Sequence, residues 1–196
     1  MERIGILGGS FDPLHLGHLW MAERARDQLS LDRVLLMPAA RPPHKDSDDM
    51  SPFSDRMTMV TRAIAGIPGL EVSDLEANRA EPSYTWDTLD RLRREYPKAS
   101  FWLVLGGDSL RDLPTWRHPE RIMSHARLAV LPRPGDAEFP AVPAGAQVDW
   151  LDGPRIQLSS TEIRTRVRQG RSIRFLVPDS TREYLEAASL YQDVPA

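Results

Sequence analysis

Short apolar runs alternate with amphipathic stretches along most of the chain. Five runs rich in aliphatic and aromatic residues predict strands, at residues 4–7, 34–37, 70–72, 101–105 and 128–131. Between them, apolar residues recur every three or four positions, as on one buried helix face, in two sets: Met57, Val60 and Ile64, and Leu89, Leu92 and Tyr96. Apolar strands that alternate with helices are typical of a covered parallel sheet. We therefore expect a Rossmann-like α/β fold, a doubly wound parallel sheet with helices on both faces.

Two segments rich in proline and polar residues, 38–54 and 132–145, interrupt this pattern and predict loops. Loops of this length in a compact domain often carry function. The chain of 196 residues has the usual size of one domain and can enclose one sizeable core. We therefore expect a single domain over residues 1–196.

Composition narrows the classes of function. The formal net charge of -3 argues against a nucleic-acid scaffold, which normally carries a basic excess. The sequence has no cysteine, which excludes disulfides and thiolate metal sites. It has no apolar run near the ~20 residues of a membrane span and no basic leader. We therefore expect a cytoplasmic protein without a nucleic-acid or membrane partner, and the sequence leaves homo-oligomer formation open.

The first predicted strand leads directly into the stretch GGSFDPLHLGH. In open α/β sheets, ligands bind beyond the carboxyl ends of the strands, where loops lead into helix N-termini. Gly8 and Gly9 let the backbone approach a ligand where a Cβ would collide, and a helix is predicted to begin near His18. The stretch matches neither the GxGxxG fingerprint nor a Walker loop, so its ligand must be inferred from its other residues.

Two histidines in this stretch are candidates for anion binding. His15 and His18 are three residues apart around a helix start, so both side chains can point the same way. Imidazolium groups beside the positive end of a helix would bind an anion such as phosphate. Two ordinary hydrogen-bonded histidines are an alternative. A zinc pair is a third interpretation, but no third ligand is evident nearby, and we predict no protein metal site.

A second cluster of polar residues, LSSTEIR, lies near the other end of the chain. Ser159 and Glu162 have the spacing of a capping box, which predicts a helix start at Ser159. The hydroxyls of Ser160 and Thr161 and the guanidinium of Arg164 then gather at a positive helix end. A plain helix cap is the alternative interpretation. The extra hydroxyls and the arginine favour a second phosphate-binding site.

Together, GGSFDPLHLGH and SSTEIR resemble the nucleotidyltransferase superfamily with (H/T)xGH and [ST]STxxR motifs. Either motif alone is a weak signal, whereas both in this order are strongly specific. In that superfamily both motifs bind the triphosphate of ATP. Class I aminoacyl-tRNA synthetases share a related histidine motif, but this chain has no KMSKS-like loop.

Three further stretches, ARPPHK, SYTWDTL and GGDSLRDLPTW, narrow the resemblance to bacterial nicotinate-nucleotide adenylyltransferases along most of the chain. Pantetheine-phosphate adenylyltransferases share the first and last motifs but lack this middle set. The resemblance implies transfer of the adenylyl group of ATP to nicotinate mononucleotide, which forms nicotinate adenine dinucleotide and pyrophosphate in NAD biosynthesis. ATP and nicotinate mononucleotide are then the expected partners.

The resemblance assigns roles to particular residues. It implies catalytic roles for His15, His18, Lys45 and Arg164, and His18 is the foremost candidate. The expected ATP-binding residues are Gly8, Gly9, Ser10, Phe11, His15, His18, Gly106, Asp108, Ser159, Ser160, Thr161 and Arg164. The expected residues for the second substrate are His44, Lys45, Thr85 and Trp116. Many relatives have a tyrosine after that tryptophan, where this chain has Arg117.

Each of the middle residues also has a simpler interpretation. His44 and Lys45 could close over a triphosphate or face solvent as a charged pair. Asp108 could accept a hydrogen bond from a ribose hydroxyl or cap a tight turn. Trp116 could stack on the pyridine ring or be an ordinary core residue.

The implied reaction explains why the sequence shows no catalytic triad. The phosphate of the acceptor, with a second pKa of about 6, is already largely dianionic at neutral pH and is itself the nucleophile. The protein has to align two polyanions and neutralise developing charge, with Mg²⁺ bound mainly through water and phosphate oxygens. The alternatives are an adenylyltransferase for another phosphorylated acceptor, a nucleotide-binding module without activity, and a small metal-binding protein.

Overall fold

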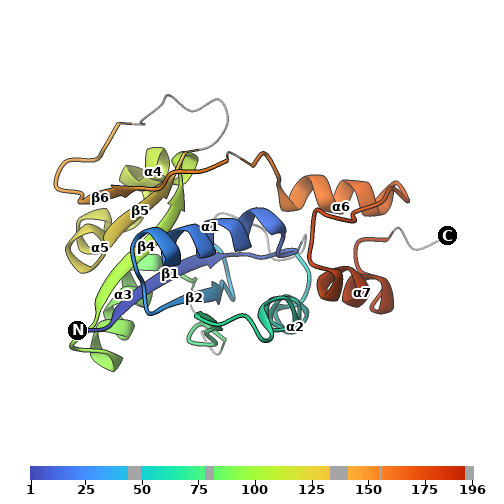
Figure 1. The fold of residues 1–196 in the computed structure, drawn as a ribbon, viewed down its shortest axis with the longest axis horizontal. Helices are drawn as coiled ribbons and strands as arrows, with labels where there is room; N and C mark the ends of the chain where they lie inside the picture. The colour runs from blue at the N-terminus through green and yellow to red at the C-terminus, as the bar shows by residue number, and fades with distance from the viewer. Residues whose placement is uncertain (44–49, 78–81, 133–140, 155, 193–196) are drawn as a thin grey trace.

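The computed structural model describes residues 1–43, 50–77, 82–132, 141–154 and 156–192. Within these residues, six parallel strands form one sheet in the order β3-β2-β1-β4-β5-β6 (Figure 1). The strands are β1 Arg3–Gly9, β2 Arg33–Pro38, β3 Leu70–Val72, β4 Ser100–Gly106, β5 Arg127–Leu131 and β6 Val148–Trp150. The predicted Rossmann-like sheet is therefore confirmed.

The strand order reverses direction between β1 and β4, which is the position where open α/β sheets bind ligands. The β1–β4 register extends only to the pair Ile6 and Leu103. Both strands continue beyond this pair, β1 to Gly9 alongside β2 and β4 to Gly106 alongside β5. Because each strand follows its outer neighbour, β1 and β4 separate at the carboxyl edge of the sheet.

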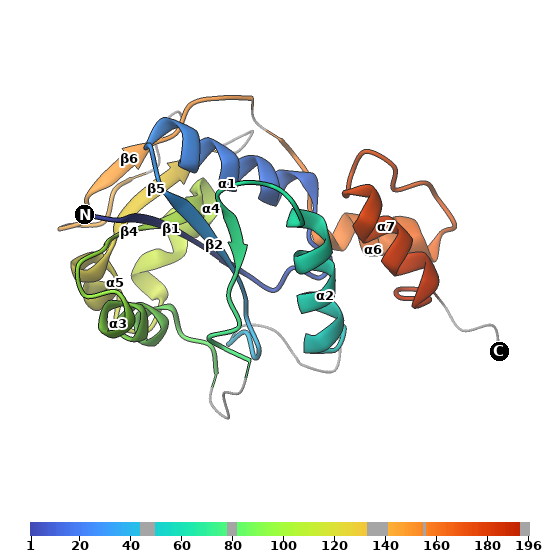
Figure 2. The same ribbon diagram turned by 60° about the horizontal axis from the view of Figure 1, so that its bottom comes forward.

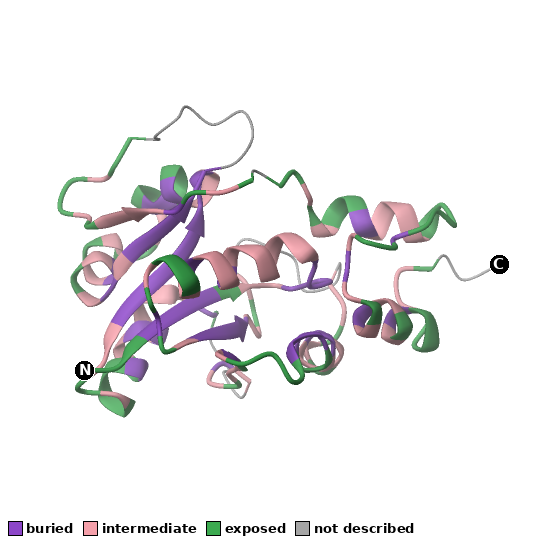
Figure 3. Cartoon of the chain, in the orientation of Figure 1, coloured by how far each residue is buried: buried purple, intermediate pink, exposed green. Residues whose placement is uncertain are grey.

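Helices cover both faces of the sheet (Figure 2). Their bounds are α1 Leu16–Gln28, α2 Phe53–Ile64, α3 Thr85–Glu95, α4 Gly107–Asp112, α5 Pro119–His125, α6 Ser160–Arg168 and α7 Asp179–Ala187, with a 3-10 turn at Leu113–Thr115. Alternate residues of β4 supply the two cores. Trp102 and Val104 pack with residues of α1 and α2, whereas Leu103 packs with residues of α3 and α5. The strands β2, β4 and β5 are buried at every residue but the first as a result (Figure 3).

The helix α7 lies beside α2, and α6 lies at the same end of the molecule, away from the sheet (Figure 1). A separate apolar cluster joins them, with Met59 from α2, Ile163 from α6 and Leu185 from α7. This packing brings the C-terminal part of the chain to the loop that follows β1. Among the described residues, no helix combines the length and apolarity that crossing a membrane requires.

Several details differ from the sequence predictions. The helix expected near His18 begins at Leu16, because His15 occupies the N-cap position and His18 its third residue. On α2, Val60 and Ile64 are buried as predicted, but Met57 is only partly buried, and Arg56 and Met59 lie on the buried face instead. The strand β6 was not predicted, since its three residues are all only partly buried.

The first predicted loop, 38–54, is shorter than expected, whereas the described residues of the second, 132 and 141–145, contain no helix or strand. Pro38 is the last residue of β2, and Phe53 and Ser54 already belong to α2. Residues 44–49 and 133–140 lie outside the described residues.

Candidate active site

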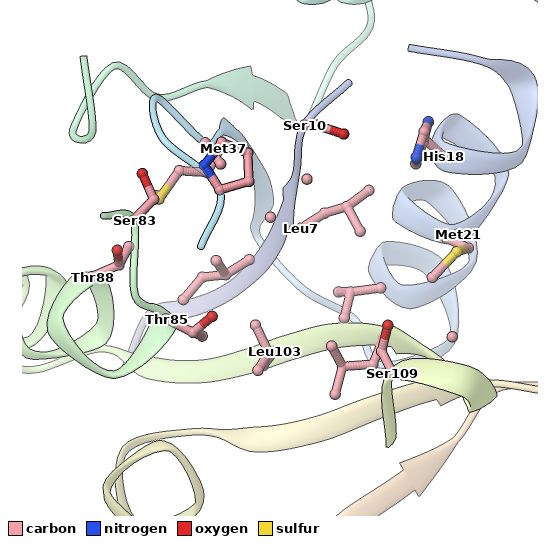
Figure 4. Close-up of a pocket in the computed structure, with 18 of the residues that line it drawn as sticks. Leu7, Ser10, His18, Met21, Met37, Ser83, Thr85, Thr88, Leu103 and Ser109 are labelled. Carbon is pink, nitrogen blue, oxygen red and sulfur yellow. The ribbon is translucent and has the colours of Figure 1, made fainter. Parts of the chain in front are cut away.

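A cavity of about 480 Å³ opens at the carboxyl edge of the sheet, at the ends of β1 and β4. Its volume falls in the range of small-molecule sites, roughly 300–1,000 Å³. Figure 4 shows His18 and Met21 from α1 on one side of β1, and Thr85 and Thr88 from α3 on the other. At Gly8, which lines the cavity, an added Cβ would meet no protein atom within 4 Å. The glycine therefore leaves this space open to a ligand.

The two histidines of the first motif lie side by side at the start of α1. Their ring centroids are 3.6 Å apart, with an angle of 19° between the planes. His18 Nδ1 accepts a hydrogen bond from the backbone N–H of His15 at 3.3 Å, and Phe11 contacts His18 edge-on. Gly17 permits this stack, since a Cβ there would lie 3.1 Å from His15 Nδ1. The first turn of α1 has no acidic residue, so both rings lie beside an uncompensated positive helix end.

The second motif lies directly against the first. Ser160 Oγ donates a hydrogen bond to the carbonyl of Pro13 at 3.0 Å, and Arg164 Nη1 donates one to the carbonyl of Asp12 at 2.8 Å. Ser159 is the N-cap of α6 and accepts a hydrogen bond from the backbone of Glu162, as the sequence predicted. The N-termini of α1 and α6 therefore meet at one cavity, which is lined by residues 159–161 of the second motif.

The remaining predicted ATP residues divide into two groups. Gly9, Ser10 and Gly106 line the cavity, as do both histidines. Phe11, Asp108 and Arg164 are not among the lining residues. Phe11 is fully buried and contacts His18 edge-on, and Asp108 lies in the first turn of α4, where Ser109 faces the cavity instead.

Arg164 contacts the loop between β1 and α1 and does not line the cavity. Besides its bond to Asp12, its Nη2 lies 3.5 Å from the Oγ1 of Thr161, which does line the cavity. His44 and Lys45 lie outside the described residues, so their roles stay predictions.

The α3 end of the cavity contains Thr85 and Trp116, two of the four residues predicted to bind the second substrate. Thr85 is the first residue of α3, and Trp116 follows the 3-10 turn in an extended conformation. The carboxylate of Glu76 also faces this end and accepts a 2.6 Å hydrogen bond from Thr88 Oγ1. Glu76 was not anticipated from the sequence, because nothing in its neighbourhood marks it as a cavity residue.

Arg56 is a second residue that the sequence analysis missed. It is 1% exposed, and its guanidinium donates to four backbone carbonyls. The acceptors are Ser10 at 2.7 Å, Ala39 at 2.8 Å, Ser51 at 3.1 Å and Ala40 at 3.4 Å. Burial lowers the pKa of Arg56, and the nearby charge of Asp12 opposes that shift. An arginine on the apolar face of a helix is the signal that could have revealed it.

Asp12, a residue of the loop between β1 and α1, is buried and accepts hydrogen bonds from other parts of the chain. It is 1% exposed, and its Oδ1 accepts a 2.6 Å hydrogen bond from the hydroxyl of Tyr191. The backbone N–H of Ser51 is 3.4 Å from the same oxygen. Burial, reinforced by the charge of Asp12, raises the pKa of Tyr191 far above its usual range, so its hydroxyl remains a donor. No local pattern around Tyr191 predicts this contact.

These features define a class of protein. Anionic ligands bind at helix N-termini, where backbone N–H groups and the helix dipole attract them. Here two such termini meet at the topological switch point of a parallel sheet, one with imidazoles and one with hydroxyls. The molecule is an α/β protein of the nucleotide-binding class.

Comparison with known proteins identifies the family. The chain matches the cytidylyltransferase-like family over residues 6–166. It is 42% identical over 189 residues to the probable nicotinate-nucleotide adenylyltransferase of Exiguobacterium sibiricum, with 96% of this chain and 98% of that protein covered. It is 44% identical over 194 residues to a Thermus thermophilus protein of the same name, with 97% and 100% covered. The chain therefore belongs to the cytidylyltransferase-like family and, within it, to the nicotinate-nucleotide adenylyltransferases.

The fold agrees with this family. The Plasmodium falciparum nicotinic acid mononucleotide adenylyltransferase complexed with NaAD has a TM-score of 0.82 to this chain at 20% sequence identity. The comparison covers 97% of this chain and 98% of that one.

Proposed function

We propose that this protein transfers the adenylyl group of ATP to nicotinate mononucleotide and releases pyrophosphate and nicotinate adenine dinucleotide. The contact between the loop after β1 and the start of α6 carries the proposal, since it brings two anion-binding helix ends to one cavity. A triphosphate can lie across both ends. The names of the relatives support the same reaction.

The acceptor supplies the nucleophile. Its phosphate oxygen attacks the α-phosphorus of ATP, the bond from that phosphorus to the bridging oxygen breaks, and pyrophosphate leaves with the electron pair. No proton has to be removed from a largely dianionic phosphate. The contribution of the protein is alignment of the two polyanions and stabilisation of the charge that grows on the leaving group.

The described residues divide this work by position. His15 and His18 contact the phosphoryl oxygens from the α1 side of the cavity, and His18 is the principal catalytic residue. Residues 159–161 at the start of α6 bind the β and γ phosphates through backbone N–H groups and hydroxyls. Arg164 supports the first loop through Asp12 and places positive charge beside Thr161. Lys45 is expected to add a further cation.

The acceptor occupies the α3 end. The ring of Trp116 stacks on the pyridine ring of nicotinate mononucleotide. The backbone near Thr85 contributes to binding of the carboxylate on that ring. Mg²⁺ is expected to accompany ATP and would be bound mainly through phosphate oxygens and water. When bound, it neutralises phosphate charge.

One assay tests the proposal. The purified protein is incubated with ATP and Mg²⁺, and pyrophosphate release is followed with nicotinate mononucleotide, nicotinamide mononucleotide or phosphopantetheine as acceptor. We expect the highest kcat/KM with nicotinate mononucleotide, together with formation of the dinucleotide. Binding of ATP without pyrophosphate release for any acceptor would contradict the proposal, as would preference for phosphopantetheine.

A further inference from the structure

Arg117 holds a distinct position at the α3 end of the cavity. It follows Trp116 directly, and both residues line the open space. Its Cζ atom lies 4.9 Å from the ring centroid of Tyr84, and its Nη1 is 3.5 Å from the Tyr84 hydroxyl. Tyr84 is the N-cap of α3 and precedes Thr85. The aromatic ring therefore holds the guanidinium at the mouth of the acceptor end.

The charges around the cavity single out Arg117. Among the cavity-lining residues that the structure describes, it is the only arginine or lysine; the two histidines lie at α1 instead. Neighbouring basic groups are already paired with carboxylates, Arg121 with Asp90 and His118 with Glu120. Within the described part of the chain, Arg117 has no such ion pair, and its one hydrogen bond goes to Tyr84. Most of its five N–H donors remain available to a ligand.

We infer that Arg117 is a specificity-determining residue that binds the carboxylate of the acceptor's pyridine ring. This inference rests on the proposed function. A guanidinium presents a planar set of donors that matches the two oxygens of a carboxylate, and such charge-assisted bonds are stronger than neutral ones. A carboxamide offers only one acceptor oxygen. Its NH₂ group is itself a donor and cannot accept a hydrogen bond from the guanidinium, which has only donors. Arg117 therefore favours nicotinate over nicotinamide mononucleotide.

The position next to Trp116 makes this contact sterically direct. A pyridine ring stacked on Trp116 lies within one residue of Arg117 along the backbone, and Tyr84 limits the directions in which the guanidinium can turn. The only acidic side chain that lines the described cavity, Glu76, is already hydrogen-bonded to Thr88. The ligand carboxylate is thus the natural counterion of Arg117.

The test compares acceptors in matched variants. Arg117→Gln removes the charge, Arg117→Lys keeps it without the planar fork, and Arg94→Gln removes an exposed arginine of α3 that does not line the cavity. For each, kcat/KM is measured with nicotinate and nicotinamide mononucleotide at saturating ATP. We expect Arg117→Gln to lower kcat/KM for nicotinate mononucleotide by about 10- to 100-fold, mainly through KM. The value for the amide should change by less than about twofold. For Arg117→Lys, kcat/KM with nicotinate mononucleotide should lie between the values of Arg117→Gln and the unaltered protein. For Arg94→Gln, it should equal that of the unaltered protein.

The outcomes separate this inference from the proposed function. If the unaltered protein uses nicotinate mononucleotide but Arg117→Gln keeps the same acid-to-amide ratio, Arg117 does not read the carboxylate. An equal loss with both acceptors would assign Arg117 to the shared phosphate or ribose and would also overturn the inference. Absence of turnover in the unaltered protein would overturn the proposed function first, and the inference with it.

Discussion

Substitution of Arg56 should destabilise the protein more than any change to a surface arginine. The buried guanidinium connects three segments: the first loop at Ser10, the end of β2 at Ala39 and Ala40, and the residues before α2 at Ser51. Arg56→Met keeps an apolar stem of similar length but removes all these donors. The four backbone carbonyls then lose their hydrogen-bond donor, and because the site is buried, water replaces that donor poorly.

The size of the effect follows from these bonds. A hydrogen bond to a charged group contributes about 1.5–3 kcal/mol, but bonds made by one guanidinium are not additive. Burying the charge also has a cost, which is the reason that burial lowers the pKa of Arg56, so removing the charge recovers part of the loss. We expect the free energy of unfolding to fall by about 3–5 kcal/mol, the range for disruption of a buried charged network. In a chain of this size, Tm should fall by on the order of 10 °C.

Urea denaturation followed by tryptophan fluorescence measures the change. Arg62→Met is the matched control, because Arg62 is exposed on the same helix and its guanidinium lies over the ring of Tyr184, a contact worth about 1 kcal/mol or less. Arg56→Lys keeps the charge, but one ammonium cannot reach carbonyls on three segments, so it should lose most of the same stability. Full stability in Arg56→Lys would show that charge alone matters and would refute the reasoning from geometry.

Three further substitutions test separate parts of the structure. His18→Ala should lower kcat by roughly 10²–10³-fold in the pyrophosphate assay, the scale for loss of one transition-state donor, and a value within about twofold of the unaltered protein would exclude its catalytic role. Arg164→Lys should raise the KM for ATP by about tenfold, because the single ammonium cannot both hold the Asp12 carbonyl and lie beside Thr161; an unchanged KM would contradict this. Hydrogen bonds from Arg127 lower the pKa of Asp149 below 3.8, so its stabilisation is complete above that pH and is lost as pH falls through the lowered value. Asp149→Asn should therefore have a lower Tm than the unaltered protein at pH 7, with a gap that narrows under acidic conditions; a constant gap would count against the pair.

The sheet was predictable because its interior strands are buried on both faces and are therefore apolar throughout. The run from Phe101 to Leu105 illustrates this. The edge strand β6 was missed because Val148–Trp150 is short, and Asp149 interrupts its apolar pattern to bind Arg127. The start of α1 at Leu16 lies slightly before the predicted position near His18, because histidine side chains, which capping preferences do not favour, occupy its cap.

The site was predictable to the extent that its chemistry is local. Glycines after a strand and hydroxyls at a helix start are visible within a few residues, and His15 and His18 lie in the same short motif. Arg56 and Tyr191 could not be found in this way, because their roles come from tertiary packing. Tyr191 contacts a carboxylate 179 positions earlier in the chain, and no short-range pattern encodes such a pairing.

These long-range contacts explain how a loop without regular structure can present a precise site. Electrostatic catalysis requires hydrogen-bond donors that are already oriented, because reorienting them during the reaction would cost part of the free energy by which they stabilise the transition state. Between β1 and α1 the chain has no ladder bonds of its own to fix it, and Asp12 and Pro13 are instead held by Ser160, Arg164 and Tyr191. Two of these partners belong to α6 and the third follows α7, and both helices are anchored to α2 through an apolar cluster. We therefore expect the orientation of the histidines to depend on the packing of the C-terminal helices, so that residues far from the cavity support the proposed site.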